Sequence, residues 1–208
     1  MTTPDRQGHP PWNASYTAAA PAPWDIGRPQ TAVVALADAG LLAGRTLDAG
    51  CGTGEHTLLA ASRGADAIGI DIAPAAIERA RAKAADRGLP ARFEVADLLA
   101  LPPALAGPVD TVLDCGVFHV FGDDDRPRYV ASLAAVLRPG GRVYLMCFSD
   151  RQPGDWGPRR VRQDELRAAF SDGWTVESIT PAVFEINQVQ DEHTVQAWLA
   201  VLRRGQSG

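Results

Sequence analysis

The sequence predicts an α/β fold with a doubly wound, mostly parallel sheet. Strand-like apolar stretches alternate with helix-like stretches through the middle of the 208-residue chain, which is the pattern of parallel βαβ units. A glycine-rich turn follows the first strand, between Gly50 and Gly54. The last two strand-like stretches have no helix between them, so we expect them to form a hairpin that contains one antiparallel strand.

Local residues mark the ends of several expected elements. Pro74 stands near the start of a helix, where its missing N–H is harmless. Acidic residues at 123–125 suit the start of another helix, because the helix dipole favours negative charge there. The Arg-Pro-Gly-Gly turn at 138–141 ends that helix. We expect helices at 30–39, 55–62, 74–87, 123–137 and 163–170, and strands at 45–49, 67–70, 92–96, 109–113, 142–148, 175–179 and 194–202.

The chain divides into an N-terminal arm at 1–29 and a single domain at 30–208. Five prolines in the first two dozen residues argue against regular structure there. The same segment holds Trp12, Tyr16 and Trp24, and disordered segments rarely keep such aromatic residues. We therefore expect the arm to pack onto the domain.

Composition argues against several classes of protein. The formal net charge of −5 is unfavourable for a nucleic-acid partner, which needs a basic surface. No apolar stretch approaches the roughly 18 residues of a membrane helix, and the polar N-terminus lacks the layout of a signal peptide. We expect a cytoplasmic protein with no membrane partner.

Cysteine and histidine spacing predicts neither a disulfide nor a metal site. The three cysteines, Cys51, Cys115 and Cys147, are widely spaced and form no C-x-x-C pair. The four histidines show no metal-ligand spacing with cysteines or carboxylates. The oligomeric state stays open.

The segment Leu47-Asp48-Ala49-Gly50-Cys51-Gly52-Thr53-Gly54 is the strongest sign of a cofactor site. Ligands in an open α/β sheet lie beyond the carboxyl ends of the strands. The glycine spacing here is G-x-G-x-G. A dinucleotide site requires G-x-G-x-x-G, and this chain has Glu55 where that motif has its third glycine. Glu55 would repel a pyrophosphate. S-adenosylmethionine carries no phosphate, so the turn favours that cofactor.

Two carboxylates follow the next strands. Asp71 ends the second strand, 21 residues after Gly50, where it can accept hydrogen bonds from both hydroxyls of a ribose. Asp97 ends the third strand, where a carboxylate or a backbone pair can bind the adenine amine. Each could instead be an ordinary turn or cap residue. Their joint position with the glycine turn favours the cofactor role.

Residues 45–148 resemble the core of class I S-adenosylmethionine-dependent methyltransferases. The resemblance rests on the Asp-Ala-Gly-Cys-Gly-Thr-Gly turn at 48–54 and the Leu-Arg-Pro-Gly-Gly-Arg turn at 137–142. It implies a Rossmann-like doubly wound sheet of seven strands, mostly parallel, with the last strand antiparallel. It also implies S-adenosyl-L-methionine as the cofactor.

The arm carries a narrower resemblance. Pro23 to Gln30 is similar to the corresponding segment of the thiopurine, thiol and halide methyltransferase group, in which aromatic residues fold over the cofactor. Together with Trp156 to Arg160, it resembles the mycobacterial heterocyclic toxin methyltransferases, which O-methylate hydroxyquinolones. Aromatic faces attract cations by about 0.5–2 kcal/mol, which suits a sulfonium. The aromatic residues could also simply hold the arm on the domain.

These considerations give a set of expected cofactor residues. Asp114 and Cys115 belong to it because they match positions that line the cofactor in the resembled group. The full set is Trp12, Tyr16, Trp24, Asp48, Gly50, Cys51, Gly52, Gly54, Asp71, Ile72, Asp97, Leu98, Asp114 and Cys115.

The segment after the fourth strand is the expected acceptor site. Methyl transfer from a sulfonium is an in-line displacement, so positioning the acceptor matters most and a general base is optional. His119 is the candidate base, with a hydrogen bond to the backbone as its alternative. Phe118 and Phe121 suggest an apolar acceptor pocket or core packing. Trp156 and Arg159 are candidate acceptor contacts, and an arginine there could equally face solvent.

The leading hypothesis is a methyltransferase that acts on an oxygen, or a nitrogen or sulfur, of a small heteroaromatic molecule such as a hydroxyquinolone, in detoxification. A methyltransferase for thiols, halides or tellurite is an alternative within the same chemistry. From another class, an NAD(P)-dependent reductase is disfavoured by Glu55 and by the lack of a Tyr-x-x-x-Lys pair. A non-catalytic cofactor-binding module stays open.

Overall fold

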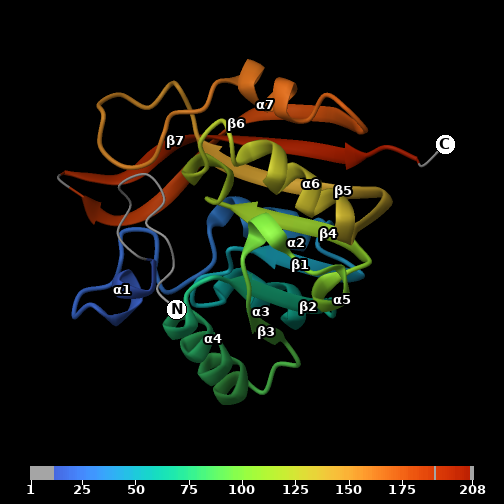
Figure 1. The fold of residues 1–208 in the computed structure, drawn as a ribbon. Helices are drawn as coiled ribbons and strands as arrows, with labels where there is room; N and C mark the ends of the chain where they lie inside the picture. The colour runs from blue at the N-terminus through green and yellow to red at the C-terminus, as the bar shows by residue number, and fades with distance from the viewer. Residues whose placement is uncertain (1–11, 190, 207–208) are drawn as a thin grey trace.

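Seven strands form one sheet in the order β3-β2-β1-β4-β5-β7-β6 (Figure 1). A computed structural model describes residues 12–189 and 191–206 of the chain. The first five strands run parallel, and β7 runs antiparallel to both of its neighbours. The predicted fold is confirmed. The strands are β1 (Arg45–Ala49), β2 (Asp66–Asp71), β3 (Arg92–Val95), β4 (Val109–Cys115), β5 (Leu137–Phe148), β6 (Trp174–Val189) and β7 (Glu192–Arg204).

Helices cover both faces of the sheet. Successive residues of a strand point to opposite faces, so Leu47 of β1 packs in one core cluster with Leu133 of α6, whereas Asp48 bonds to Thr57 of α3 on the other face. The helices are α1 (Trp12–Thr17), α2 (Thr31–Asp38), α3 (Glu55–Ser62), α4 (Pro74–Arg87), α5 (Pro103–Ala106), α6 (Arg126–Val136) and α7 (Gln163–Ala169), with short 3-10 turns η1 (Leu98–Ala100) and η2 (Phe118–Val120).

The expectation that the arm has no regular structure is wrong for α1. The prolines of this region flank residues 12–17 and none interrupts them, so nothing removes a donor from that turn of helix. The helix lies beside the start of α4 (Figure 1). Residues 1–11 of the expected arm lie outside the described residues.

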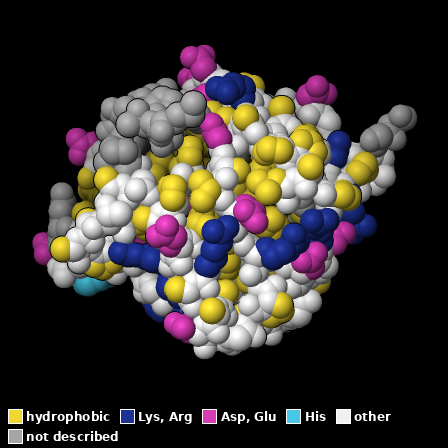
Figure 2. Space-filling model, turned by 60° about the horizontal axis from the view of Figure 1, so that its bottom comes forward, with side chains coloured by type: hydrophobic (Ala, Val, Ile, Leu, Met, Phe, Trp, Pro, Cys, Tyr) yellow, Lys and Arg dark blue, Asp and Glu magenta, His cyan; other side chains and the backbone are white. Residues whose placement is uncertain are grey.

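The long hairpin of β6 and β7 exceeds the predicted strands at both ends, because pairing between the strands continues from Trp174–Arg204 to Val189–Glu192. Within the described part of the chain, no helix is long and apolar enough to cross a membrane. On the face that Figure 2 shows, Lys and Arg side chains lie among Asp and Glu side chains.

Candidate cofactor and acceptor site

The glycine turn lies where β1, β2 and β4 end. Ala49, the last residue of β1, pairs with Ile70 on one side and with Asp114 on the other. The backbone N–H groups of Gly50 and Cys51 donate to the carbonyl of Ile70 at 2.8 and 3.0 Å. The carboxyl ends of the parallel strands therefore meet around this turn, as the sequence predicted.

Two glycines of the turn allow close approach by other residues. Gly50 has φ +70°, and a Cβ there would lie 2.1 Å from Cγ2 of Val117. Gly52 has φ +52°, and a Cβ there would lie 2.9 Å from the hydroxyl of Tyr16. Since both conformations favour glycine and neither site has room for a side chain, the turn requires glycine at both positions, and the loop after β4 and the arm pack directly against it.

Asp71 ties the end of β2 to the glycine turn. Its Oδ2 accepts from the N–H of Gly52 at 2.9 Å, and its Oδ1 accepts from the N–H of Ala73 at 2.9 Å. Burial raises the pKa of Asp71, and these backbone hydrogen bonds oppose the rise. Asp97 accepts from the N–H of Leu99 at 2.9 Å and so caps η1, which is the alternative role considered above.

Asp48 lies beneath the turn, on the face covered by α3. Its Oδ2 accepts from the hydroxyl of Thr57 at 2.7 Å, and its Oδ1 is buried with no hydrogen-bond partner among the described residues. Burial raises the pKa of Asp48 to about 7. A buried carboxylate oxygen without a donor is costly on its own and favourable beside a cationic ligand.

The carboxylate of Asp114 is used inside the protein. It accepts from the N–H of Val117 at 2.8 Å, from the N–H of Phe118 and from the hydroxyl of Tyr129 at 2.8 Å. Burial raises its pKa to about 7. The side chain thereby folds the loop after β4, which leaves the backbone around Asp114 and Cys115 as the part that faces the turn. No pattern in the sequence indicated this role of Tyr129, because Tyr129 stands among the apolar residues of α6.

The aromatic residues of the arm lie over the glycine turn. The indole N–H of Trp24 donates to the hydroxyl of Tyr16 at 3.0 Å, and the ring of Trp12 lies edge-on to Trp24 with centroids 5.7 Å apart. Tyr16 is buried, and burial together with the nearby charge of Asp71 raises its pKa. Trp24 remains 44% exposed. The structure brings the three expected arm residues together.

Polar contacts that the sequence did not predict hold the arm in place. The hydroxyl of Thr53 donates to Asp25 at 2.7 Å, and the amide of Asn187 donates to the carbonyls of Ala22 and Asp25 at 2.8 and 2.9 Å. Arg28 and Glu185 form a two-bond ion pair at 2.8 and 3.1 Å. Such partners lie far apart in the chain, so no local pattern marks them.

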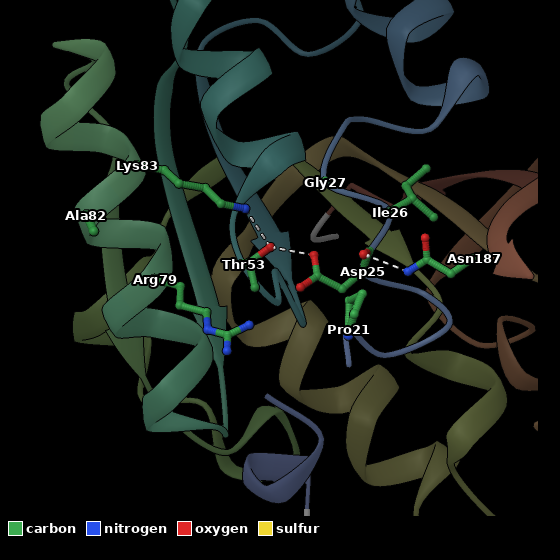
Figure 3. Close-up of a pocket in the computed structure, with 9 residues that line it drawn as sticks. All are labelled: Pro21, Asp25, Ile26, Gly27, Thr53, Arg79, Ala82, Lys83 and Asn187. Carbon is green, nitrogen blue, oxygen red and sulfur yellow. Dashed lines mark hydrogen bonds between the residues drawn. The ribbon is translucent and has the colours of Figure 1, made fainter. Parts of the chain in front are cut away.

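A cavity of about 510 Å³ lies between the arm and α4 (Figure 3). Its lining includes Asp25, Thr53, Arg79, Lys83 and Asn187. None of the expected cofactor residues lines it. The cavity is thus adjacent to the glycine turn, through Thr53, and does not include Asp71.

His119 is bound to the backbone of the next strand. Its Nδ1 accepts from the N–H of Phe148 at 2.9 Å, and its ring lies against Phe148 and Phe184, with centroids 5.0 and 5.9 Å away. Because a neutral imidazole has one acceptor nitrogen, this hydrogen bond occupies the atom that would take a proton. The geometry therefore argues against the general-base role and matches the backbone-bonded alternative.

Three of the residues expected to contact the acceptor, Phe118, Phe121 and Arg159, have other partners in the structure. Phe118 is fully buried in the main core against Phe170, and Phe121 packs on Tyr129. Both match the core-packing alternative.

Arg159 forms ion pairs with Asp123 and Glu165, which hold it away from any acceptor contact. Trp156, by contrast, lies edge-on to Phe148 with centroids 6.1 Å apart. Trp156 also packs against the buried cluster that contains Phe148 and Phe184. Among the described residues, no group of three or more His, Cys, Asp or Glu side chains is arranged to hold a metal ion.

The residues at the turn suit S-adenosylmethionine. The glycine backbone allows close approach, Asp71 can accept from a ribose, and the unpaired oxygen of Asp48 favours a cation. Asp71 already accepts hydrogen bonds from two backbone N–H groups, and each of its oxygens can accept further hydrogen bonds.

Known proteins resemble the chain over most of its length. The family described as "Methyltransferase domain" matches residues 46–141. A 2-heptyl-1-hydroxyquinolin-4(1H)-one methyltransferase of Mycobacteroides abscessus is 38% identical over 180 residues, which cover 82% of this chain and 79% of that protein. A probable thiol methyltransferase 2 of Arabidopsis thaliana is 31% identical over 157 residues, which cover 74% of this chain and 68% of that protein.

Solved structures share the fold. One from work on the conversion of a disulfide bond into a thioacetal group during echinomycin biosynthesis has a TM-score of 0.86 at 38% identity, and the match covers 95% of this chain and 93% of that one. The magnesium protoporphyrin IX methyltransferase of Synechocystis PCC 6803, solved with S-adenosylmethionine, has a TM-score of 0.65 at 23% identity over 84% of this chain and 77% of its own. With its sheet order and its glycine turn, the chain belongs to the class I methyltransferases and is an S-adenosylmethionine-dependent small-molecule methyltransferase.

Proposed function

We propose that the protein transfers a methyl group to an oxygen of a small heteroaromatic molecule, such as a hydroxyquinolone, and that the reaction serves detoxification. The observation that carries this proposal is the aromatic cluster formed by His119, Phe148, Trp156 and Phe184. A flat, apolar acceptor would contact this cluster at Trp156, the ring of the four that is not buried, because aromatic rings prefer stacked or edge-on contacts with one another.

The aromatic cluster lies next to the end of β4. Gly116 follows that strand, and a Cβ there would lie 3.4 Å from Nε2 of His119 and 3.8 Å from the ring of Phe184. Because Gly116 has no side chain, its backbone lies close to these two rings, which are themselves buried. An acceptor held on the cluster can thus present its nucleophile toward a cofactor at that turn.

S-adenosylmethionine supplies an electrophilic methyl group on its sulfonium when it is bound. The chain's own residues orient the acceptor and exclude water from the contact. No described side chain of the cluster offers a base, since Nδ1 of His119 is engaged by Phe148. An N-hydroxyl group conjugated with a carbonyl ionises more readily than an alcohol, so such an acceptor needs no base from the protein.

For the cofactor, we infer that Asp71 binds the ribose hydroxyls, and that the segment of Asp97 and Leu98 binds the adenine. The arm at 1–29 covers the cofactor through Tyr16 and Trp24. The indole N–H of Trp24 is directed to Tyr16, which leaves the ring face for a cation. Gly50, Cys51, Gly52, Gly54 and the backbone near Ile72 and Cys115 complete this proposed site.

Sulfur is the second candidate for the acceptor atom. The relative named a probable thiol methyltransferase and the structure solved in work on a disulfide-to-thioacetal conversion both point to sulfur chemistry. The latter matches nearly the whole chain. A sulfur-bearing aromatic molecule would use the same aromatic cluster, so the two candidates differ in the acceptor atom and share the site.

A labelled-methyl transfer screen tests the proposal. We expect transfer to hydroxyquinolones or to aromatic thiols, and a rise in the acceptor KM on Trp156→Ala, with an unchanged KM for S-adenosylmethionine. Trp174→Ala is the matched control, because Trp174 packs on Phe170 in the main core. Transfer only to halide or tellurite, with no response to Trp156→Ala, would refute the aromatic acceptor.

A further inference from the structure

The cavity between the arm and α4 is lined by apolar side chains and by cationic side chains (Figure 3). Pro21 and Ile26 of the arm and Ala82 of α4 form apolar surface, while Arg79 and Lys83 of α4 supply cations. Figure 3 shows the Lys83 side chain reaching toward Thr53 and the Arg79 side chain directed into the same space.

The acidic groups around the cavity are already engaged. Lys83 donates to Thr53 and pairs with Glu55, both at 2.8 Å, and Arg87 forms a two-bond pair with the same Glu55. Asp25 accepts from the hydroxyl of Thr53. Among the described residues, one cation at the cavity therefore has no ionic partner.

That cation is Arg79. It is exposed and forms no hydrogen bond or ion pair with any residue in the described ranges. Its neighbours on the helix, Lys83 and Arg87, both bind Glu55. A planar guanidinium with several donors is well suited to bind an oxyanion with two hydrogen bonds.

We propose that this cavity binds a small molecule that carries an oxyanion, a carboxylate or a phosphate, on a compact apolar body. Arg79 binds the oxyanion, and Pro21 and Ile26 cover the apolar part. Neither Asp71 nor any residue of the aromatic cluster lines this cavity, so the site is distinct from both.

Occupancy of the cavity strengthens cofactor binding. One wall of the cavity is the arm itself, and the same arm places Tyr16 against Gly52. A ligand that contacts both the arm and α4 favours the closed position of the arm and therefore the bound cofactor. Coupling of this kind is reciprocal, so the cofactor must also strengthen binding in the cavity. This coupling rests on the proposed closure of the arm over the cofactor.

Lys83 allows occupancy to be observed directly, because it is the only lysine of the chain. Reductive methylation with isotope-labelled formaldehyde gives one lysine signal in the NMR spectrum, besides that of the N-terminus. We expect benzoate or inorganic phosphate to shift this signal saturably in the wild type and in Arg167→Gln, and not in Arg79→Gln. Arg167 is an exposed arginine of α7, far from the cavity in the chain, and serves as the charge-matched control.

A shift of equal size and affinity in Arg79→Gln, or no saturable shift with either probe, overturns the site. A response to phosphate alone identifies a phosphate ligand, and a response to benzoate identifies a carboxylate on an apolar body. Both of these outcomes support the site.

Calorimetry with S-adenosylhomocysteine tests the coupling separately, since it needs no acceptor. At constant ionic strength, the effective probe should tighten binding of S-adenosylhomocysteine by about fivefold in the wild type and in Arg167→Gln. In Arg79→Gln the enhancement should vanish, while the affinity without probe is unchanged. Saturable binding at Lys83 without any enhancement would keep the site and refute the coupling, and acceptor turnover bears on neither result.

Discussion

The carboxylate of Asp71 accepts a hydrogen bond from the backbone N–H of Gly52 at 2.9 Å, which joins the end of β2 to the glycine turn after β1. Tyr16 closes over the same glycine from the arm. The proposed sugar-binding carboxylate, the turn and the arm therefore meet at one point, and a change at any of them is expected to alter cofactor affinity.

Replacement of Asp71 should weaken cofactor binding. We expect Asp71→Ala to lower the affinity for S-adenosylhomocysteine by about 1–3 kcal/mol, because charged hydrogen bonds are lost. Calorimetry measures the change. Asp66→Ala, at the exposed start of the same strand, is the control and should bind normally. Equal affinities of Asp71→Ala and the wild type would remove Asp71 from the site.

A side chain at Gly52 should displace Tyr16. Gly52→Ala and Gly64→Ala both force a non-glycine residue to positive φ, but only the first places a Cβ against another residue. Overpacking adds about 1–3 kcal/mol, so Gly52→Ala should destabilise the protein more than Gly64→Ala does. Thermal unfolding measures this difference, and cofactor affinity should fall only for Gly52→Ala. If Tyr16→Phe fails to restore part of the loss, Tyr16 is not the obstacle.

We expect His119 to position the acceptor and not to remove its proton. We expect His119→Ala to lower kcat/KM by about tenfold to a hundredfold with cofactor affinity within a few-fold, since the acceptor loses its support. His119→Asn should recover most of the activity, because the asparagine oxygen can accept from Phe148 as Nδ1 does. Equal losses in the two variants, together with a pH–rate profile that has lost one ionisation of the wild type, would restore the general-base role.

The buried carboxyl of Asp48 should make stability depend on pH. Its pKa rises from 3.8 to about 7 on folding because of burial. The protonated form is thus favoured in the folded state, and its stabilising effect is present at low pH and is lost as the pH rises toward about 7. The free energy of unfolding of the wild type, relative to Asp48→Asn, should fall over this range and then stay level.

Urea unfolding at a series of pH values measures this dependence. Asp172→Asn, in an exposed loop, is the control and should show the slope of the wild type. A relative stability of Asp48→Asn that is independent of pH would show that Asp48 ionises normally.

The sequence predicted most accurately the bounds of elements that are set by residues within or next to the element. The bounds of α4 match the prediction, because Pro74 opens the helix and Gly88, at φ +60°, ends it. The strands of the last hairpin were predicted too short, since their length depends on pairing between β6 and β7 and not on local pattern. In the site, the glycine turn and Asp71 stand at the predicted strand ends.

Contacts between distant parts of the chain escaped prediction. Asn187 and Glu185 hold the arm from the hairpin, more than 150 residues away. The hydrogen bond of His119 to Phe148 depends on the packing of β4 against β5. Which of the roles considered for Phe118 and Arg159 applies depends in the same way on partners that only the folded chain brings together.

A crystal structure with S-adenosylhomocysteine tests the central claim most directly. We expect the adenosyl group beside Gly52, with both ribose hydroxyls within hydrogen-bond distance of Asp71 and with Trp24 over the sulfur. An adenosyl group that lies instead in the cavity of Arg79, or away from Asp71, would contradict it.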